Sequence, residues 1–297
     1  MGPRSQRILF TGATSQAGRA FYLRLIQQGH DVVAVSRTPS PHIPGKTCQA
    51  DLTSPDLLKQ LPDEHFDALI HFASHVPLRE RESTWEECVE PNIYGTAKLL
   101  NWAHGRVERI LVASSVTVYG EPKLHSPVDE SYPLHPDTAY AISKYGQEKL
   151  FQAFCLPRSI PLVIIRLGWV YGPGLHEDRA IMKFLRQVQQ KKPITLFNSK
   201  TAGLQLIHQD DIAWVGDRLL RDGHGIYNLA STRHISLMEF VEALMRVTGQ
   251  RTEVICQDDA HAPSPWHYSH QRLSTLHGIL PHVTLETGIK SLLESHG

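Results

Sequence analysis

Two side chains with the spacing of one helical turn could form a proton-transfer site. Residues 140–144 read Tyr-Ala-Ile-Ser-Lys, and a helix would bring Tyr140 and Lys144 onto the same face. A positive charge beside a phenol stabilises phenolate, so we expect the pKa of Tyr140 to fall from about 10 towards neutral pH. Tyr140 is therefore a candidate proton donor and acceptor. The alternative is a packed ring beside a lysine that reaches solvent.

A glycine-rich turn near the N-terminus could hold phosphate groups. An apolar run at 7–11 precedes the turn, and helical spacing over 17–28 follows it. Glycines there let the backbone approach a pyrophosphate, which the N–H groups and the positive helix end stabilise. Ser15 stands where a middle glycine is expected, and because serine is small we expect it to be tolerated. The predicted dinucleotide-binding residues of the turn are Gly12, Thr14, Ser15, Gln16, Ala17 and Gly18.

The end of the second predicted strand indicates which dinucleotide binds. An acidic residue there would accept hydrogen bonds from the adenosine ribose, but this chain has Ser36 and Arg37. An arginine suits a 2′-phosphate, so the sequence favours NADP over NAD. The alternative is that Arg37 is a solvated loop charge. Asp51 and Leu52, after the next turn, could cover the adenine.

The composition excludes several classes of protein. Among 297 residues, 30 are Lys or Arg and 30 are Asp or Glu, which gives no support for binding to nucleic acid or to an anionic membrane. No apolar run approaches the roughly 20 residues of a membrane span. The four cysteines lie far apart, and the eighteen histidines are scattered, so no metal site is predicted. We expect a cytoplasmic protein with reduced thiols.

Short apolar runs alternate with helical segments, which is typical of a doubly wound parallel sheet. The predicted fold is α/β, a Rossmann-type parallel sheet with helices on both faces and a smaller C-terminal substrate lobe. We assign residues 1–172 to a dinucleotide-binding domain and 173–297 mainly to the lobe, with residues near 205–230 returning to the main domain. The predicted strands are 7–11, 31–36, 66–73, 109–114 and 162–166, and the predicted helices are 17–28, 86–103 and 140–155.

The chain resembles the extended short-chain dehydrogenase/reductase superfamily, in its NAD-dependent epimerase/dehydratase family. The resemblance rests on segments 11–18, 51–52, 71–74, 92–96, 114–120, 140–144, 166–174 and 207–211, in that order. It implies that Ser115, Tyr140 and Lys144 form a catalytic trio, with Ser115 holding the reacting oxygen and Lys144 also holding the nicotinamide ribose. It further implies that Phe72, Ala73 and Ser74 lie near the cofactor, and His75 and Asn92 near the substrate.

The substrate side departs from the family pattern. Related dehydratases carry Asp-Glu just after the catalytic hydroxyl residue, where this chain has Val116 and Thr117, so dehydration is disfavoured. Relatives that bind nucleotide diphosphates often carry an arginine where Leu204 stands. Arg179 is one possible replacement. Trp169 could stack on a flat or apolar group, or pack in the core.

Three functions are compatible with these features. The first is an NAD(P)-dependent oxidoreductase or epimerase of a nucleotide-linked sugar. The second is an NADP-dependent carbonyl reductase of a ketone or aldehyde without a nucleotide, which Leu204 and Trp169 favour. The third is a non-catalytic dinucleotide sensor, against which the intact trio argues.

The resemblance also implies a homodimer joined by a four-helix bundle. Apolar positions that could form it are Leu99, Leu100, Leu150, Phe151 and Phe154, although these side chains could equally face the sheet.

Overall fold

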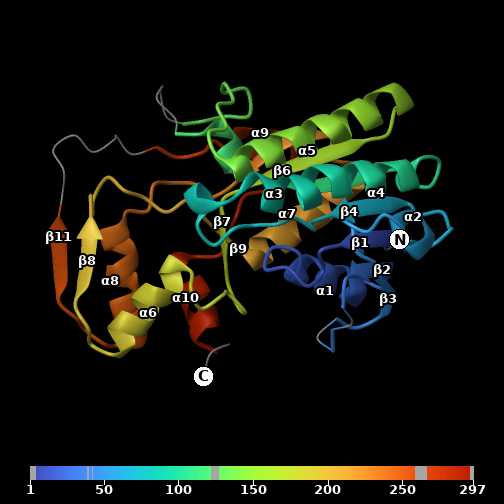
Figure 1. Ribbon diagram of the computed structural model, residues 1–297. Helices are drawn as coiled ribbons and strands as arrows, with labels where there is room; N and C mark the ends of the chain where they lie inside the picture. Colours follow the sequence, from blue (N-terminus) through green and yellow to red (C-terminus); the bar gives the residue numbers. More distant parts are fainter. Residues whose placement is uncertain (1–4, 39, 42, 122–126, 258–265, 295–297) are drawn as a thin grey trace.

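The computed structural model describes residues 5–38, 40–41, 43–121, 127–257 and 266–294. Within this part of the chain, seven strands form one parallel sheet in the order β10-β6-β5-β4-β1-β2-β3 (Figure 1). The strands are β1 (Arg7–Thr11), β2 (Asp31–Ser36), β3 (Lys46–Gln49), β4 (Ala68–His71), β5 (Ile110–Ser115), β6 (Leu162–Leu167) and β10 (Gly225–Leu229). The predicted doubly wound sheet is confirmed.

The strand order reverses between β1 and β4, which are paired neighbours in the sheet. Chain order runs outward through β2 and β3 on one side of this point and through β5 and β6 on the other. In open α/β sheets such a switch point opens a crevice outside the carboxyl ends of the strands, where ligands bind. The residues that end β1, β4 and β5 therefore define the candidate site.

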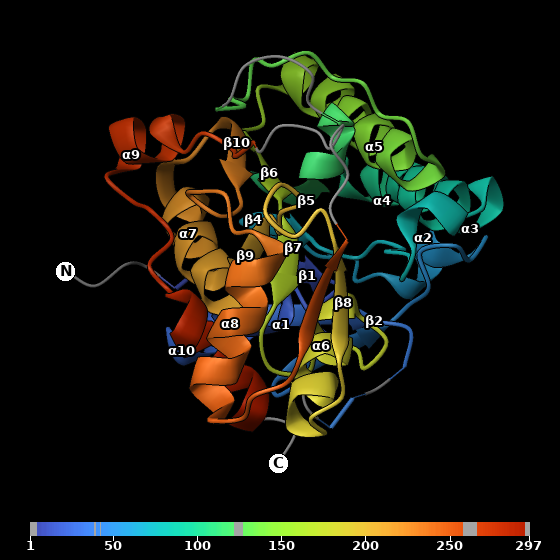
Figure 2. The same ribbon diagram turned by 90° about the vertical axis from the view of Figure 1, so that its left-hand side faces the viewer.

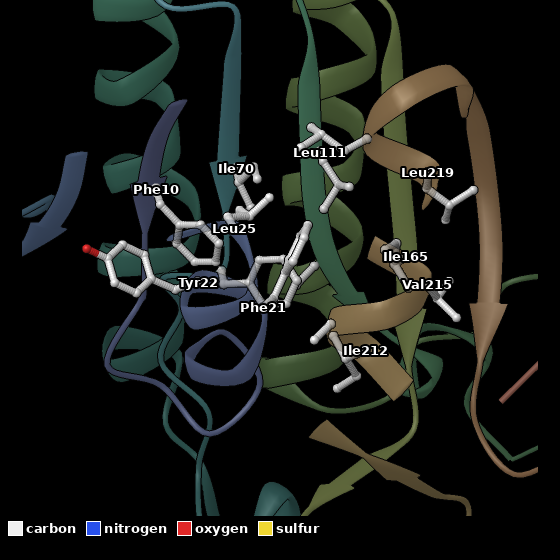
Figure 3. Close-up of a cluster of buried hydrophobic side chains, with 14 of the residues drawn as sticks. Phe10, Phe21, Tyr22, Leu25, Ile70, Leu111, Ile165, Ile212, Val215 and Leu219 are labelled. Carbon is white, nitrogen blue, oxygen red and sulfur yellow. The ribbon is translucent and has the colours of Figure 1, made fainter. Parts of the chain in front are cut away.

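One face of the sheet is covered by α1 (Arg19–Gln27), α7 (Gln209–Asp222) and α9 (Gln271–His277). Figure 3 shows Phe21 of α1 and Ile212 of α7 packed with strand residues such as Phe10 and Ile165. Gly216 lets the two helices approach closely, because a Cβ there would lie 2.8 Å from the Phe21 ring. The glycine-rich turn between β1 and α1 is therefore held by a core that includes α7, which lies far away in the sequence.

The other face is covered by α2 (Leu57–Gln60), α4 (Gly95–Ala103) and α5 (Ala139–Cys155). The side chains expected at a dimer interface lie here instead of outside. Leu99, Leu100 and Phe151 are at most 5% exposed, and Leu150 and Phe154 pack against the same cluster. Of the two alternatives for these residues, the structure favours the one in which they face the sheet, with Leu150 and Phe154 partly buried.

The predicted helix over 86–103 is interrupted. It divides into α3 (Trp85–Val89), a π-helical turn η2 (Glu90–Tyr94) and α4. Pro91 lacks an N–H group and cannot make the helical hydrogen bond at that point, so the chain adopts a wider turn. Short 3₁₀ turns occur at η1 (Glu80–Glu82), η3 (Val116–Tyr119) and η4 (Leu156–Arg158).

Residues after the main alternation build a separate small lobe, seen at the left of Figure 1 and facing the viewer in Figure 2. Its parallel pair β8 (Ile194–Phe197) and β11 (Val254–Gln257) packs with α6 (Ala180–Gln189), α8 (Leu237–Thr248) and α10 (Leu285–Glu294). A second parallel pair, β7 (Trp169–Tyr171) and β9 (Leu206–His208), connects the lobe to the sheet. After it, α7 and β10 return to the main sheet.

Candidate active site

The candidate site lies at the carboxyl ends of three neighbouring strands. Thr11 ends β1, His71 ends β4 and Ser115 ends β5, and these strands are adjacent in the sheet. Helix α5 starts beside them, because Thr138 caps its first turn by accepting a hydrogen bond from the backbone N–H of Ala141 (3.1 Å). Tyr140 therefore enters the site from the first turn of a rigid helix.

The glycine turn has the close packing that a dinucleotide site needs. Gly12 has φ +80°, and a Cβ there would lie 2.4 Å from the backbone nitrogen of Ala73. A Cβ at Gly18 would lie 2.4 Å from the carbonyl oxygen of Gly12. Gly18 is the N-cap residue of α1, so the positive end of that helix lies directly after the turn. The turn therefore fits a pyrophosphate.

The Ser15 side chain makes its hydrogen bonds within the glycine turn. Its hydroxyl donates to the carbonyl oxygen of Gly12 (2.7 Å) and accepts from the N–H of Gly18 (3.0 Å), so the side chain folds back into the turn. Thr14 lies exposed beside it, and Ala17 packs against the core below. Gln16 donates to the carbonyl oxygen of Gly172 (3.1 Å), which ties this turn to the end of β7.

Ser115 and Tyr140 are brought together by tertiary structure. The Ser115 hydroxyl lies close enough to the Tyr140 hydroxyl to act on its pKa, and Thr117 donates a hydrogen bond to the Ser115 hydroxyl oxygen (3.0 Å). Tyr140 is only 7% exposed. Burial raises the pKa of the Tyr140 hydroxyl above its ordinary value, the negative charge of Glu80 raises it further, and the Ser115 hydroxyl opposes the rise. The predicted lowering of the Tyr140 pKa is therefore wrong.

Lys144 extends towards the sheet instead of the phenol. Its ammonium donates to the carbonyl oxygen of Ala113 (2.7 Å), to Ser74 Oγ (3.4 Å) and to Gln147 Oε1. Burial lowers the pKa of the Lys144 ammonium to about 7, and the negative charge of Glu148 opposes this change. Helical spacing places the two Cβ atoms on one face, but a long flexible side chain follows its hydrogen-bond acceptors.

Glu80 is a site residue that sequence reasoning missed. Its carboxylate accepts a hydrogen bond from Thr138 Oγ1 (2.7 Å). Burial raises the pKa of the Glu80 carboxyl, although the Thr138 hydrogen bond opposes the rise. The charged sequence around it, Arg-Glu-Arg-Glu over 79–82, is typical of a solvated surface segment, so it carries no local signal.

Asn92 is fully buried and clamps the chain that follows β4. Its Oδ1 accepts from Ser74 Oγ (2.8 Å) and from the His75 N–H (2.8 Å), and its Nδ2 donates to Ser143 Oγ (2.9 Å). Asn92 therefore positions residues 74–75 against α5. The expected place of Asn92 near the substrate stays a prediction.

The residues expected around adenosine lie just past the carboxyl ends of the paired strands β2 and β3. Arg37 is exposed, and the Ser36 hydroxyl donates to the carbonyl oxygen of Thr38 (2.6 Å). Although burial would raise the pKa of the Asp51 carboxyl, hydrogen bonds from Thr53 and the charges of Arg37 and Lys98 lower it.

Two apolar residues that are expected near the cofactor have packing roles. Leu52 lies against Gly95, because a Cβ added at Gly95 would be 3.1 Å from the Cβ of Leu52. The Phe72 ring packs in the core beside Phe10. Both therefore hold the crevice in shape.

The expected substrate residues divide into exposed and buried groups. Trp169 is 50% exposed, so core packing does not explain it. Arg179 donates to the carbonyl oxygen of Pro77 (3.0 Å), and its charge acts on Tyr140. Val116 and Leu204 are 3% and 2% exposed and belong to hydrophobic clusters. Both side chains pack within these clusters, and their expected contact with the substrate stays a prediction.

The model of the NAD dependent epimerase/dehydratase family matches residues 8–230. The chain belongs to this family. The predicted class of enzyme, an extended short-chain dehydrogenase/reductase, is thereby confirmed.

Two curated relatives are similar to this family member. A UDP-glucuronate 4-epimerase of Thermodesulfobacterium geofontis is 29% identical over 215 residues, which span 70% of this chain and 65% of the relative. The human dTDP-D-glucose 4,6-dehydratase is 28% identical over 265 residues, covering 84% of this chain and 74% of the relative.

Several solved structures have the same fold as this chain. A UDP-glucose 4-epimerase from Thermotoga maritima, with UDP-glucose, has a TM-score of 0.86 at 20% identity and 98% coverage of both chains. A UDP-glucuronic acid 4-epimerase from Bacillus cereus in complex with NAD scores 0.82 at 23% identity, covering 97% of this chain and 96% of that one. RMD from Pseudomonas aeruginosa, complexed with NADPH, scores 0.83 at 24% identity, covering 98% and 99%. In the described part of this family member, no helix has the length and apolarity to cross a membrane.

Proposed function

We propose that this protein is an NAD(P)-dependent epimerase or oxidoreductase that acts on a nucleotide-linked sugar. The observation that carries the proposal is the juxtaposition of the Ser115 and Tyr140 hydroxyls at the carboxyl ends of the central strands, in a fold whose glycine turn fits a pyrophosphate. The named relatives act on UDP- or dTDP-linked sugars, which supports this substrate class over a ketone without a nucleotide.

The chain's own residues then have distinct roles. Ser115 hydrogen-bonds the reacting oxygen of the sugar, and Tyr140 takes the proton from that oxygen or returns it. The nicotinamide supplies hydride acceptance and donation when it is bound. Lys144, held beside Ser74, provides a positive charge at the end of β4. The turn 12–18 holds the pyrophosphate.

We propose NADP as the preferred cofactor because Arg37 stands exposed at the end of β2. Ser36 and Arg37 would contact the adenosine ribose, and Asp51 would lie beside them. The Pseudomonas neighbour is complexed with NADPH and the Bacillus neighbour with NAD, so both cofactors suit the fold.

We also propose a homodimer formed by the α3–α5 region. Trp85, Tyr94 and Ile142 are 58%, 56% and 38% exposed on elements that contact one another. These large apolar side chains replace the buried leucines as interface candidates. Light scattering should give twice the chain mass, and a Trp85→Glu, Tyr94→Glu double variant should be monomeric.

Turnover of a substrate panel tests the function. The protein is incubated with NAD or NADP and with UDP- and dTDP-hexoses, and the products are separated by chromatography. We expect at least one nucleotide sugar to be converted and Tyr140→Phe to abolish conversion, because only the proton-carrying hydroxyl is removed.

Tyr145→Phe is the matched control, since it removes a hydroxyl from the same helix and should keep activity. Cofactor binding by Tyr140→Phe should stay within about twofold of wild type, a difference below about 0.4 kcal/mol. If NADP raises the melting temperature while no nucleotide sugar does so or is turned over, the sugar assignment is wrong. A small ketone reduced under the same conditions would then support the carbonyl reductase.

A further inference from the structure

A chain of buried hydrogen bonds runs below the catalytic residues, from the glycine turn to Lys144. His71 Nδ1 lies 2.7 Å from Thr11 Oγ1, and His71 Nε2 lies 3.0 Å from Gln147 Nε2. Gln147 Oε1 in turn accepts a hydrogen bond from the Lys144 ammonium. Thr11, His71 and Gln147 have no exposed surface, so water does not compete for these contacts.

The orientation of the Gln147 amide follows from its partners. Thr96 donates its hydroxyl hydrogen to the carbonyl oxygen of Asn92 (2.8 Å), so Thr96 Oγ1 can accept the second Gln147 N–H at 2.8 Å. Burial lowers the pKa of His71 to about 3, with the charge of Lys144 contributing, and the neutral ring can donate from Nδ1 and accept at Nε2. Both amide hydrogens are then used, and the amide oxygen must face Lys144.

We propose that Gln147 is a positioning residue that holds the Lys144 ammonium at the end of β4 by bridging it to His71. The bridge links Lys144 to Thr11, which begins the glycine turn. Without it, the ammonium keeps Ala113 O and Ser74 Oγ but loses a buried acceptor, and His71 loses its donor. The catalytic consequence rests on the proposed function, whereas the position of the ammonium does not.

The groups that act on Lys144 set the expected signs. Glu148, on the same helix, favours the charged form and is itself paired with Arg166 of β6. His71 of β4 is neutral near pH 7. Loss of the Gln147 oxygen should therefore make the ammonium easier to deprotonate, and a carboxylate at the same place should make it harder.

The test is an NMR titration of the whole protein labelled with ¹³C at lysine Cε. The Lys144 signal is assigned by its absence in Lys144→Arg. We expect a wild-type midpoint near pH 7. Gln147→Met, which keeps the length but removes the amide, should titrate about one unit lower, and Gln147→Glu about one unit higher, the size of shift that one hydrogen bond to a charged group produces.

Gln152 provides a matched control on the same helix. It accepts a hydrogen bond from Lys149 three residues earlier (3.3 Å), the same spacing as Lys144 and Gln147, but on an exposed face. Gln152→Met should leave the Lys144 titration unchanged. Opposite shifts in the two Gln147 variants support the proposal, and unchanged midpoints or shifts of one sign overturn it. If Gln147→Met does not fold, the upward shift of the isosteric Gln147→Glu decides.

A kinetic readout connects the bridge to catalysis. The limb of the kcat–pH profile that reports Lys144 should move in the same direction as the NMR midpoint, with KM for the sugar changed less than kcat. If no sugar is turned over but the NMR midpoints shift in opposite directions, the proposed function fails while the positioning role stands.

Discussion

Loss of the Glu148 charge should strongly destabilise the fold, because its partner is a buried guanidinium. Arg166 on β6 and Glu148 on α5 each have side chains 2% exposed. They make two parallel hydrogen bonds, of 3.0 and 2.9 Å, and Ser114 donates a third to Glu148 (2.6 Å). Arg166 also donates to the Tyr119 hydroxyl (2.8 Å) and lies over that ring. The pair therefore joins β5, β6, η3 and α5 below the catalytic residues.

The magnitude follows from the uncompensated charge. Breaking a buried ion pair from one side costs about 3–5 kcal/mol. Glu148→Gln keeps the shape and one acceptor oxygen but removes the charge, so its free energy of unfolding should fall by this amount. For 297 residues, this corresponds to a melting temperature about 5–8 °C lower. Urea unfolding, followed by circular dichroism at fixed pH, measures the change.

A double-mutant cycle separates the charge from packing. Glu148→Met and Arg166→Met should each destabilise strongly, whereas the double variant should lose much less than their sum, because no buried charge is left unpaired. Asp63→Asn is the control, since it removes the charge from an exposed pair with Arg106 and should cost less than about 1 kcal/mol. A Glu148→Gln effect as small as the control, or additive single effects, would refute the reasoning.

Three further predictions concern individual charges. Glu80→Gln should lower the pKa of Tyr140, because the Glu80 charge raises it. In the oxidative direction, the limb of the kcat–pH profile that reports Tyr140 should then move to lower pH. An unmoved limb would show that the Glu80 charge does not act on the phenol. Arg37→Asp should shift the preference from NADP towards NAD, which competition binding measures, and an unchanged ratio would exclude Arg37 as the 2′-phosphate contact. His71 stays neutral in the folded protein down to a pH of about 3, whereas in the unfolded chain it binds a proton below pH 6.5. Between these two values, each unit by which the pH falls should therefore lower the free energy of unfolding by about 1.4 kcal/mol. His71→Gln should flatten the pH dependence of urea unfolding in that range, and an equally steep dependence would contradict the assignment.

Much of the main sheet could be predicted because its strands are locally encoded. The runs at 7–11 and 31–36 match β1 and β2 residue for residue, since the middle of a strand that is covered on both faces must be apolar. The edge strand β3, with sequence Lys-Thr-Cys-Gln and mostly exposed side chains, gave no such signal. Its position is determined by backbone pairing with β2 along one of its two edges.

Local patterns also predicted the glycine turn and Tyr140, and the resemblance to the family predicted Ser115, because the proposed roles require particular residue types at particular spacings. The surroundings of these residues were decided elsewhere. Lys144 turns towards Ala113 and Gln147, and the charge that acts on the phenol comes from Glu80, 60 positions earlier in the chain. A pKa depends on burial and on charges a few ångströms away, and only the packing of distant segments determines which charges those are.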